Sequence, residues 1–250
     1  MIKNILIFRT DRIGDLLYTC PTIKTIKTTF PDSKLTIIAS ENNYKYAKTF
    51  EFIDEIYLMP KKSLWSRIKL FYKLYKKKYD LIYIFDGKDR SLIFTSFLKS
   101  DKKVAKIVNK KQAIFSKIFK IKFSYDIFGK DLNELHQDLL LYSGINQKIT
   151  HFDYLTKKKD NNFLNSIPLD SFIQVHLDEK WFSSSYIKKY ADISPSYEEF
   201  SNFIKLLSSK NNVLISTGLI SNNLINRLEQ NSKKQLFDKI FLYDIKENII

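Results

Sequence analysis

The chain has 250 residues, of which 44% are hydrophobic and 15% aromatic, and it contains one cysteine, Cys20. Such a chain can bury one large core or two modest ones, so the composition excludes an intrinsically disordered protein and a small disulfide-stapled scaffold. No apolar run approaches the roughly 20 residues that span a bilayer, and Arg9 follows the first apolar stretch too soon for a signal peptide. We therefore expect a cytoplasmic protein, either soluble or peripheral to a membrane.

The net charge of +15 is concentrated in one segment of the chain. Residues 61–122 hold 19 basic and 4 acidic residues, an excess equal to the net charge of the whole chain. Such a block favours binding to phosphate groups, nucleic acid or an anionic lipid surface. The plain alternative is a lysine-rich composition of the kind that AT-rich codons produce. That bias would enrich lysine everywhere, however, and does not explain an excess confined to one segment.

Strands and helices are predicted to alternate along residues 1–150. Short apolar runs indicate strands, and apolar residues at helical spacing indicate helices. The joints between them are short and polar, which is typical of a parallel sheet covered by helices on both faces. The expected strands are 3–8, 34–39, 54–59, 79–85, 104–108 and 123–127, and the expected helices are 15–30, 42–50, 63–78 and 132–142, the last closed by Gly144.

A second domain is predicted after a linker at residues 151–170, a polar segment without an apolar period. Strands and helices alternate again over residues 171–250, so we expect a second doubly wound domain there. Only three strands are expected in it, fewer than a sheet usually has, so the domain is either small or part of a fragment. The predicted fold class is therefore α/β, with two doubly wound domains. The elements expected here are strands 171–176, 212–217 and 239–242 and helices 197–209 and 222–233.

The most informative loop is Arg9-Thr-Asp-Arg-Ile-Gly-Asp15, at the carboxyl end of the first expected strand, where open α/β sheets bind ligands. It has one glycine, so it is neither a dinucleotide-binding loop nor a P-loop. We expect a tight loop at Gly14 that presents Arg12 and Asp15 beside a helix N-terminus. A carboxylate there can accept a proton from a bound hydroxyl group, and the cations and free N–H groups favour anions. The structural alternative for Asp15 is a plain helix N-cap, which the spacing alone favours.

Residues 9–31 resemble the opening of glycosyltransferase family 9, the lipopolysaccharide heptosyltransferases, whose first strand leads into an Arg-x-Asp-Arg-Ile-Gly-Asp-like loop and a helix that ends near Phe-Pro. The likeness continues at residues 34–39, 52–56 and 134–145 and covers the first domain and about half of the second. It implies a GT-B-like fold, with two Rossmann-like domains and the active site in the cleft between them. It also implies inverting, metal-independent transfer of a heptose, typically from ADP-heptose, to the lipid-anchored lipopolysaccharide core, without a cofactor.

The resemblance also implies roles for individual residues. Asp15 matches the proposed general base of the family, so the resemblance favours a catalytic role over that of a helix N-cap. One carboxylate can serve as both base and cap. Arg12 and Gly14 shape its loop. In the second domain Lys180 and Trp181 match a lysine that contacts the donor phosphate and the tryptophan that closely follows it. The alternative is that Lys180 is one of many lysines and Trp181 an ordinary core residue. Further donor-binding candidates at the strand ends are Asp178, Thr217 and Gly218.

Two departures from the family pattern concern the donor. After Thr217-Gly218 the chain reads Leu-Ile-Ser-Asn-Asn, where the family often has an acidic residue that helps to hold the donor nucleoside. The family's diphosphate-binding Asp-Ser-Gly-Pro-like loop would lie beyond Ile250. The alternative to an enzyme is therefore a non-catalytic, truncated relative that binds a membrane or glycolipid through its basic first domain.

Partners are predicted mainly from the basic segment. The expected helix 63–78 is amphipathic and can rest on an anionic bilayer, the alternative being a sheet-covering helix with a solvated lysine face. Residues 113–123 form a second basic, aromatic patch, so we expect a peripheral protein on the inner face of the cytoplasmic membrane. No nucleic-acid-binding motif and no metal-ligand spacing of histidines is present, so neither partner is expected. The apolar face of the helix consists of Leu64, Ile68, Phe71 and Tyr75.

Overall fold

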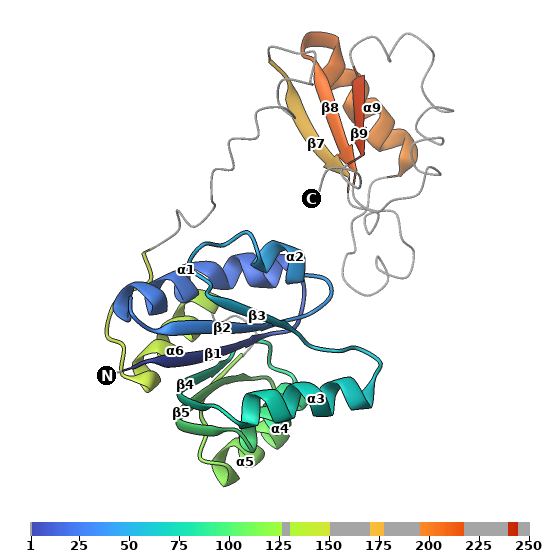
Figure 1. Ribbon diagram of the computed structural model, residues 1–250. Helices are drawn as coiled ribbons and strands as arrows, with labels where there is room; N and C mark the ends of the chain where they lie inside the picture. Colours follow the sequence, from blue (N-terminus) through green and yellow to red (C-terminus); the bar gives the residue numbers. More distant parts are fainter. Residues whose placement is uncertain (1, 127–130, 151–170, 178–195, 218–239, 245–250) are drawn as a thin grey trace. The chain divides into compact units, whose positions relative to one another are not determined.

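The computed structural model describes residues 2–126, 131–150, 171–177, 196–217 and 240–244. The chain divides into two compact units, Met1–Lys158 and Lys159–Ile250, and each is described by itself. Both units contain a parallel sheet and at least one helix that connects its strands, which confirms the predicted α/β class (Figure 1).

The sheet of the first unit has six parallel strands in the order β3-β2-β1-β4-β5-β6. This order is that of the classic doubly wound fold, and it reverses direction between β1 and β4. Residues 5–8 of the first strand and 81–84 of the fourth are continuous apolar runs, as strands covered on both faces require. The strands are β1 (Asn4–Arg9), β2 (Lys34–Ala39), β3 (Glu55–Leu58), β4 (Lys78–Ile84), β5 (Lys99–Ile107) and β6 (Lys122–Tyr125).

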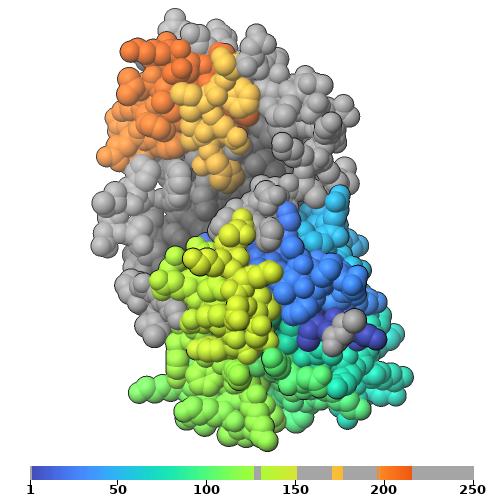
Figure 2. Space-filling view, turned by 90° about the vertical axis from the view of Figure 1, so that its left-hand side faces the viewer, coloured from blue at the N-terminus to red at the C-terminus, as the bar shows by residue number. Residues whose placement is uncertain are grey.

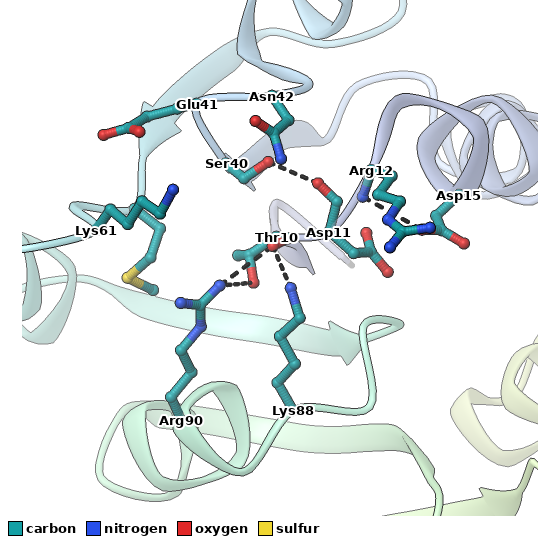
Figure 3. Close-up of a pocket in the computed structure, with 11 residues that line it drawn as sticks. Thr10, Asp11, Arg12, Asp15, Ser40, Glu41, Asn42, Lys61, Lys88 and Arg90 are labelled. Atoms are coloured by element: carbon teal, nitrogen blue, oxygen red, sulfur yellow. Dashed lines mark hydrogen bonds between the residues drawn. The ribbon is translucent and has the colours of Figure 1, made fainter. Parts of the chain in front are cut away.

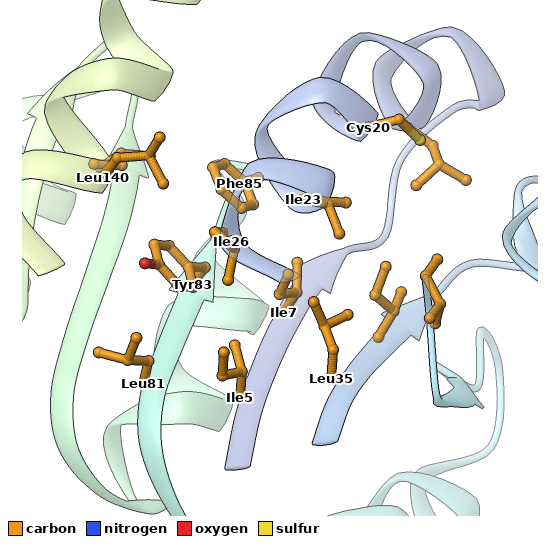
Figure 4. Packing of buried hydrophobic residues seen from close by; sticks show 14 of the residues in the cluster. Ile5, Ile7, Cys20, Ile23, Ile26, Leu35, Leu81, Tyr83, Phe85 and Leu140 are labelled. Atoms are coloured by element: carbon orange, nitrogen blue, oxygen red, sulfur yellow. The ribbon is translucent and has the colours of Figure 1, made fainter. Parts of the chain in front are cut away.

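Helices cover both faces of this sheet because successive side chains of each strand point to opposite sides. Ile5 and Ile7 pack with α1, α2 and α6 in one buried cluster (Figure 4), and Figure 2 shows α6 in yellow-green beside α1 in blue on this side. Leu6 and Phe8 pack with α3, α4 and α5 in the other cluster. The helices are α1 (Ile13–Thr29), α2 (Tyr44–Ala47), α3 (Leu64–Tyr75), α4 (Asp89–Ser96), α5 (Lys110–Ile118) and α6 (Leu132–Ser143).

Helices α4 and α5 were absent from the sequence-based prediction, although they cover one end of the sheet. Their buried faces explain the omission. Most of the buried residues of α4 are serine and threonine, and those of α5 are glutamine, alanine and serine. Small and polar side chains on the buried face of a helix give no apolar periodicity, the signal on which such predictions rest. Strand β5 likewise begins five residues earlier than expected, because its first half is lysine-rich.

Helix α6 ends at Gly144, as the sequence predicts. Gly144 ends the helix in the left-handed conformation, with φ of 95°, which favours glycine. On the same helix His136 is buried between the rings of Tyr18 and Phe85, with Nδ1 3.1 Å from the Thr22 hydroxyl oxygen. Burial lowers the pKa of His136 to about 3, so this histidine stays neutral and serves the core rather than the site. No helix in the described segments is long and apolar enough to cross a bilayer.

The second unit contains a three-stranded parallel sheet in the order β7-β8-β9. Helix α9 begins with a capping box, in which Ser196 and Glu199 each accept a hydrogen bond from the other's backbone N–H group. The predicted helix 222–233 lies outside the described residues. The elements are β7 (Ile173–Leu177), α9 (Tyr197–Lys210), β8 (Val213–Thr217) and β9 (Ile240–Asp244).

Candidate functional site

A cavity of about 350 Å³ opens at the carboxyl edge of the first sheet, where the strand order reverses. Side chains that follow β1, β2, β3 and β4 line it together, which is the usual place for a ligand in an open parallel sheet. Figure 3 shows that its polar side chains converge on the loop after β1. The lining residues are Thr10, Asp11, Arg12, Asp15, Ser40, Glu41, Asn42, Met59, Lys61, Lys88 and Arg90.

Asp15 lies in the first turn of α1 and lines this cavity. The predicted N-cap position is wrong, because the helix starts two residues earlier and Arg12 precedes it as the cap residue. The Asp15 carboxylate nevertheless accepts a hydrogen bond from the Arg12 backbone N–H at 3.2 Å. Its side chain keeps 46% of its surface exposed. Asp15 therefore holds the start of the helix and presents a carboxylate to the cavity at the same time.

Buried Arg9 ties three elements together beneath the site. Its guanidinium donates to the main-chain oxygen of Asp15 at 2.9 and 2.7 Å and to the main-chain oxygen of Phe85. It also forms an ion pair with Asp11 at 3.1 Å and lies 3.7 Å from the Asp15 carboxylate. Because Arg9 ends β1 while Phe85 follows β4, this one side chain fixes the first turn of α1 against the point where the sheet reverses direction.

Asp11 is a second carboxylate of the site, for which no role was predicted from the sequence. Its Oδ2 atom pairs with Arg9, whereas Oδ1 is buried without a hydrogen-bond partner among the described residues. Burial, supported by the nearby carboxylates of Asp15 and Asp86, raises the pKa of Asp11 to about 6 against the opposing effect of Arg9 and Lys88. A carboxyl group that follows a buried strand within an Arg-x-Asp pattern is the only signal in the sequence that could have identified it.

Asp11 predicts a pH-dependent stability. Its pKa is about 6 in the folded chain and 3.8 for an unperturbed aspartate, so the favourable contribution of the protonated group is complete below pH 3.8 and is lost as pH rises through 6. The free energy of unfolding of the wild type, minus that of Asp11→Asn, should therefore fall by roughly 2 kcal/mol between pH 4 and 7. Chemical denaturation at several pH values measures this difference. A difference that stays flat over this pH range would contradict the assignment.

The far wall of the cavity is built around Asp86, which follows β4. This carboxylate accepts hydrogen bonds from the hydroxyl groups of Thr10 at 2.5 Å and Ser91 at 2.6 Å. Lys88 and Arg90 both donate to the main-chain oxygen of Thr10, and burial lowers the pKa of Lys88. Two cations next to the N-terminus of α4 thus face the two carboxylates of the β1–α1 loop, so the cavity can take up both an anionic group and a hydroxyl group. The sequence does not predict a role for these cations, because α4 has no apolar periodicity that would indicate a helix here.

Gly14 does not form the expected tight loop. It is the second residue of α1, its φ is not positive, and a Cβ atom built there would meet nothing within 4 Å. The fold therefore makes no demand for glycine at this position. Gly14→Ala should raise the free energy of unfolding by about 0.4–1 kcal/mol, because alanine restricts the unfolded chain and favours the helix. Thermal denaturation tests this. A destabilised variant would show that the backbone requires glycine here.

Of the donor-side candidates, the structure describes Thr217. Thr217 ends β8, in register with Leu177 of β7 and Asp244 of β9, so the carboxyl ends of all three strands meet there. Asp178, Lys180, Trp181 and Gly218 lie outside the described residues, and their roles stay predictions. Among the described residues no group of three or more histidine, cysteine, aspartate or glutamate side chains is arranged to hold a metal ion.

No protein-family model and no curated protein matches the sequence. Solved structures do match. The E. coli heptosyltransferase WaaC with ADP-2-deoxy-2-fluoro heptose has 17% sequence identity and a TM-score of 0.66, over 96% of this chain and 76% of that chain. E. coli ADP-heptose LPS heptosyltransferase II has 12% identity and a TM-score of 0.67, over 96% and 72%. A glycosyl transferase family 9 structure from Veillonella parvula DSM 2008 has 15% identity and a TM-score of 0.68, over 98% and 70%. The GT-B-like fold expected from the β1–α1 loop is confirmed: this chain has the fold of the heptosyltransferases.

Proposed function

We propose that the chain is a glycosyltransferase in which Asp15 is the general base. The main support is the position of the Asp15 carboxylate, which is half-exposed and lines a cavity where the strand order of the sheet reverses. The Arg12 backbone N–H holds this carboxylate in place. The β1–α1 loop that supplies this carboxylate is also the part of the sequence that resembles family 9. The shared fold with the heptosyltransferase structures supports the proposal.

The proposed reaction is a single displacement with inversion at the anomeric carbon. A hydroxyl oxygen of the acceptor forms the new bond to that carbon, the bond from the carbon to the phosphate oxygen of the donor breaks, and the nucleoside diphosphate leaves with the bonding electrons. The acceptor proton passes to Asp15, whose carboxylate is exposed to the cavity. Cationic side chains rather than a metal ion would stabilise the departing diphosphate, and Lys180 is the candidate in the second unit.

For the substrates we propose ADP-heptose as the donor and a lipid-linked saccharide of the lipopolysaccharide core type as the acceptor. The donor is suggested by the E. coli WaaC structures, whose ligands are ADP-2-deoxy-2-fluoro heptose and ADP. The acceptor is suggested by the cavity itself, where Lys88 and Arg90 can hold an anionic group of a saccharide while Asp15 faces a hydroxyl group. The competing candidate is a binding protein without turnover, which would use the same cavity to hold a glycolipid.

Calorimetry with ADP and ADP-heptose tests the proposal, on the wild type, Lys180→Ala and Asp15→Ala. We expect donor binding that is lost in Lys180→Ala and retained in Asp15→Ala, followed by release of ADP when a core-type acceptor is added, with the same rate in EDTA. Donor binding without ADP release would favour the binding protein. No donor binding by the wild-type chain would refute the enzymatic proposal.

A further inference from the structure

Helix α3 exposes large apolar side chains that its packing does not require. The sequence predicts one apolar face on this helix. A neighbouring stripe of residues packs on the sheet, with Leu70 and Leu74 buried and Phe71 partly buried. Most of the apolar face named from the sequence therefore does not cover the sheet, since Leu64, Ile68 and Tyr75 remain exposed. Trp65 is 81% exposed, Leu64 67%, Tyr72 59% and Ile68 47%. Soluble proteins seldom present a contiguous apolar patch without using it for binding.

The neighbouring helices continue this surface. Helices α3, α4 and α5 form one layer over the same face of the sheet (Figure 1), and the rings of Phe71 and Phe94 join α3 to α4 at 5.2 Å. Beyond α3, the exposed apolar residues of this layer are Ile93, Phe97, Ile114 and Ile118, with exposed fractions of 51, 56, 62 and 68%. Exposed apolar residues thus occur on all three helices of this layer.

The charge of this layer is strongly positive. Neither α3 nor α5 contains an acidic residue, and each carries lysine side chains between its exposed apolar residues. Lys76 lies over the Tyr72 ring at 4.3 Å from its centroid, a contact that keeps an ammonium group at the level of the aromatic surface. Exposed tryptophan and tyrosine with interleaved lysine is the composition of segments that lie in the headgroup region of an anionic bilayer.

We infer that the outer surface of α3, flanked by α5, docks on an anionic lipid bilayer with Trp65 and Ile68 inserted between the headgroups. This inference goes beyond the proposed function, because it concerns a surface and not the cavity. The two are neighbours, since Lys61 lines the cavity and α3 begins three residues later. Docking would place the cavity close to lipid headgroups, at the anionic inner face of the cytoplasmic membrane, where a lipid-linked acceptor can enter it.

Trp65 itself reports the docking. The chain has two tryptophans, so Trp181→Phe leaves Trp65 as the only one. With vesicles of phosphatidylglycerol and phosphatidylcholine in equal parts, we expect a blue-shifted emission of Trp65, quenching by lipids brominated near the headgroup, and co-sedimentation of the protein. Vesicles of phosphatidylcholine alone should give neither. In the wild-type chain, Lys69→Gln with Lys73→Gln should weaken the vesicle partition about 25-fold, or fivefold for each lysine.

Matched variants separate docking from general stickiness. Trp65→Ser with Ile68→Ser should abolish sedimentation, whereas Leu206→Ser, at a 71% exposed apolar position on α9, should leave it unchanged. Likewise Lys45→Gln with Lys48→Gln, on the opposite face of the first unit, should change the partition less than threefold. Equal loss in these controls, an unshifted Trp65 emission, or tighter binding to random duplex DNA than to the vesicles would overturn the inference. None of these readouts depends on glycosyl transfer, so the docking inference and the proposed function can fail separately.

Discussion

Asp15→Asn is expected to lower turnover by about 10²–10⁴-fold while leaving donor affinity within about twofold, because an amide cannot take the proton of the acceptor hydroxyl group. The substitution preserves the shape of the side chain, and its amide oxygen can still accept the Arg12 N–H bond that starts α1. The fold should therefore persist, and the melting temperature should stay within a few degrees of the wild type. Release of ADP from ADP-heptose with a core-type acceptor measures turnover.

The matched control for this variant is Asp32→Asn, which changes an exposed carboxylate just beyond the other end of α1. It should turn over like the wild type. Asp15→Asn with more than a tenth of wild-type activity would exclude Asp15 as the base. Asp11 would then be the candidate to test next, since its pKa is raised to about 6 and general bases act best near the working pH.

The strands and the first loop were predictable because their signals are local. Apolar runs such as residues 34–39 coincide with β2, and the Arg12 and Asp15 side chains line the cavity that a strand end suggests. The remaining half of the site depends on contacts between distant residues. Thr10 and Asp86 are 76 residues apart, and only the pairing of β1 with β4 brings them to hydrogen-bonding distance. A sequence pattern without that pairing cannot indicate that Asp86 belongs to the same site.

Local sequence patterns also fail to predict which face of α3 packs on the sheet. Periodicity correctly predicts that α3 is helical, but two adjacent stripes of this helix are both apolar. The sheet can bury only one of them, and Leu70 and Leu74 belong to the buried cluster that also holds side chains of β1 and β4. Which stripe is exposed depends on the tilt of the helix across the sheet, a property of the assembled layer rather than of the α3 sequence.

Arg9→Met should be the most destabilising single change at the site, costing about 3–5 kcal/mol, because it leaves the Asp11 carboxylate buried without its cation. It also removes the donors to the main-chain oxygens of Asp15 and Phe85, so the first turn of α1 loses its tie to β4. Equilibrium denaturation at pH 7.5 measures the loss. Arg12→Met makes the same chemical change at an exposed neighbour and should cost less than about 0.5 kcal/mol.

A second substitution identifies the cause of that loss. If an unpaired buried charge is responsible, Asp11→Asn in the Arg9→Met background should restore more than about 1 kcal/mol, since the neutral amide carries no desolvated charge. The restoration should vanish near pH 4, where Asp11 is protonated in either background, because its folded pKa lies well above that pH. Equal stability of Arg9→Met and Arg12→Met would show instead that the ion pair beneath the cavity does not hold the β1–α1 loop, and the support proposed for Asp15 would have to come from the Arg12 backbone alone.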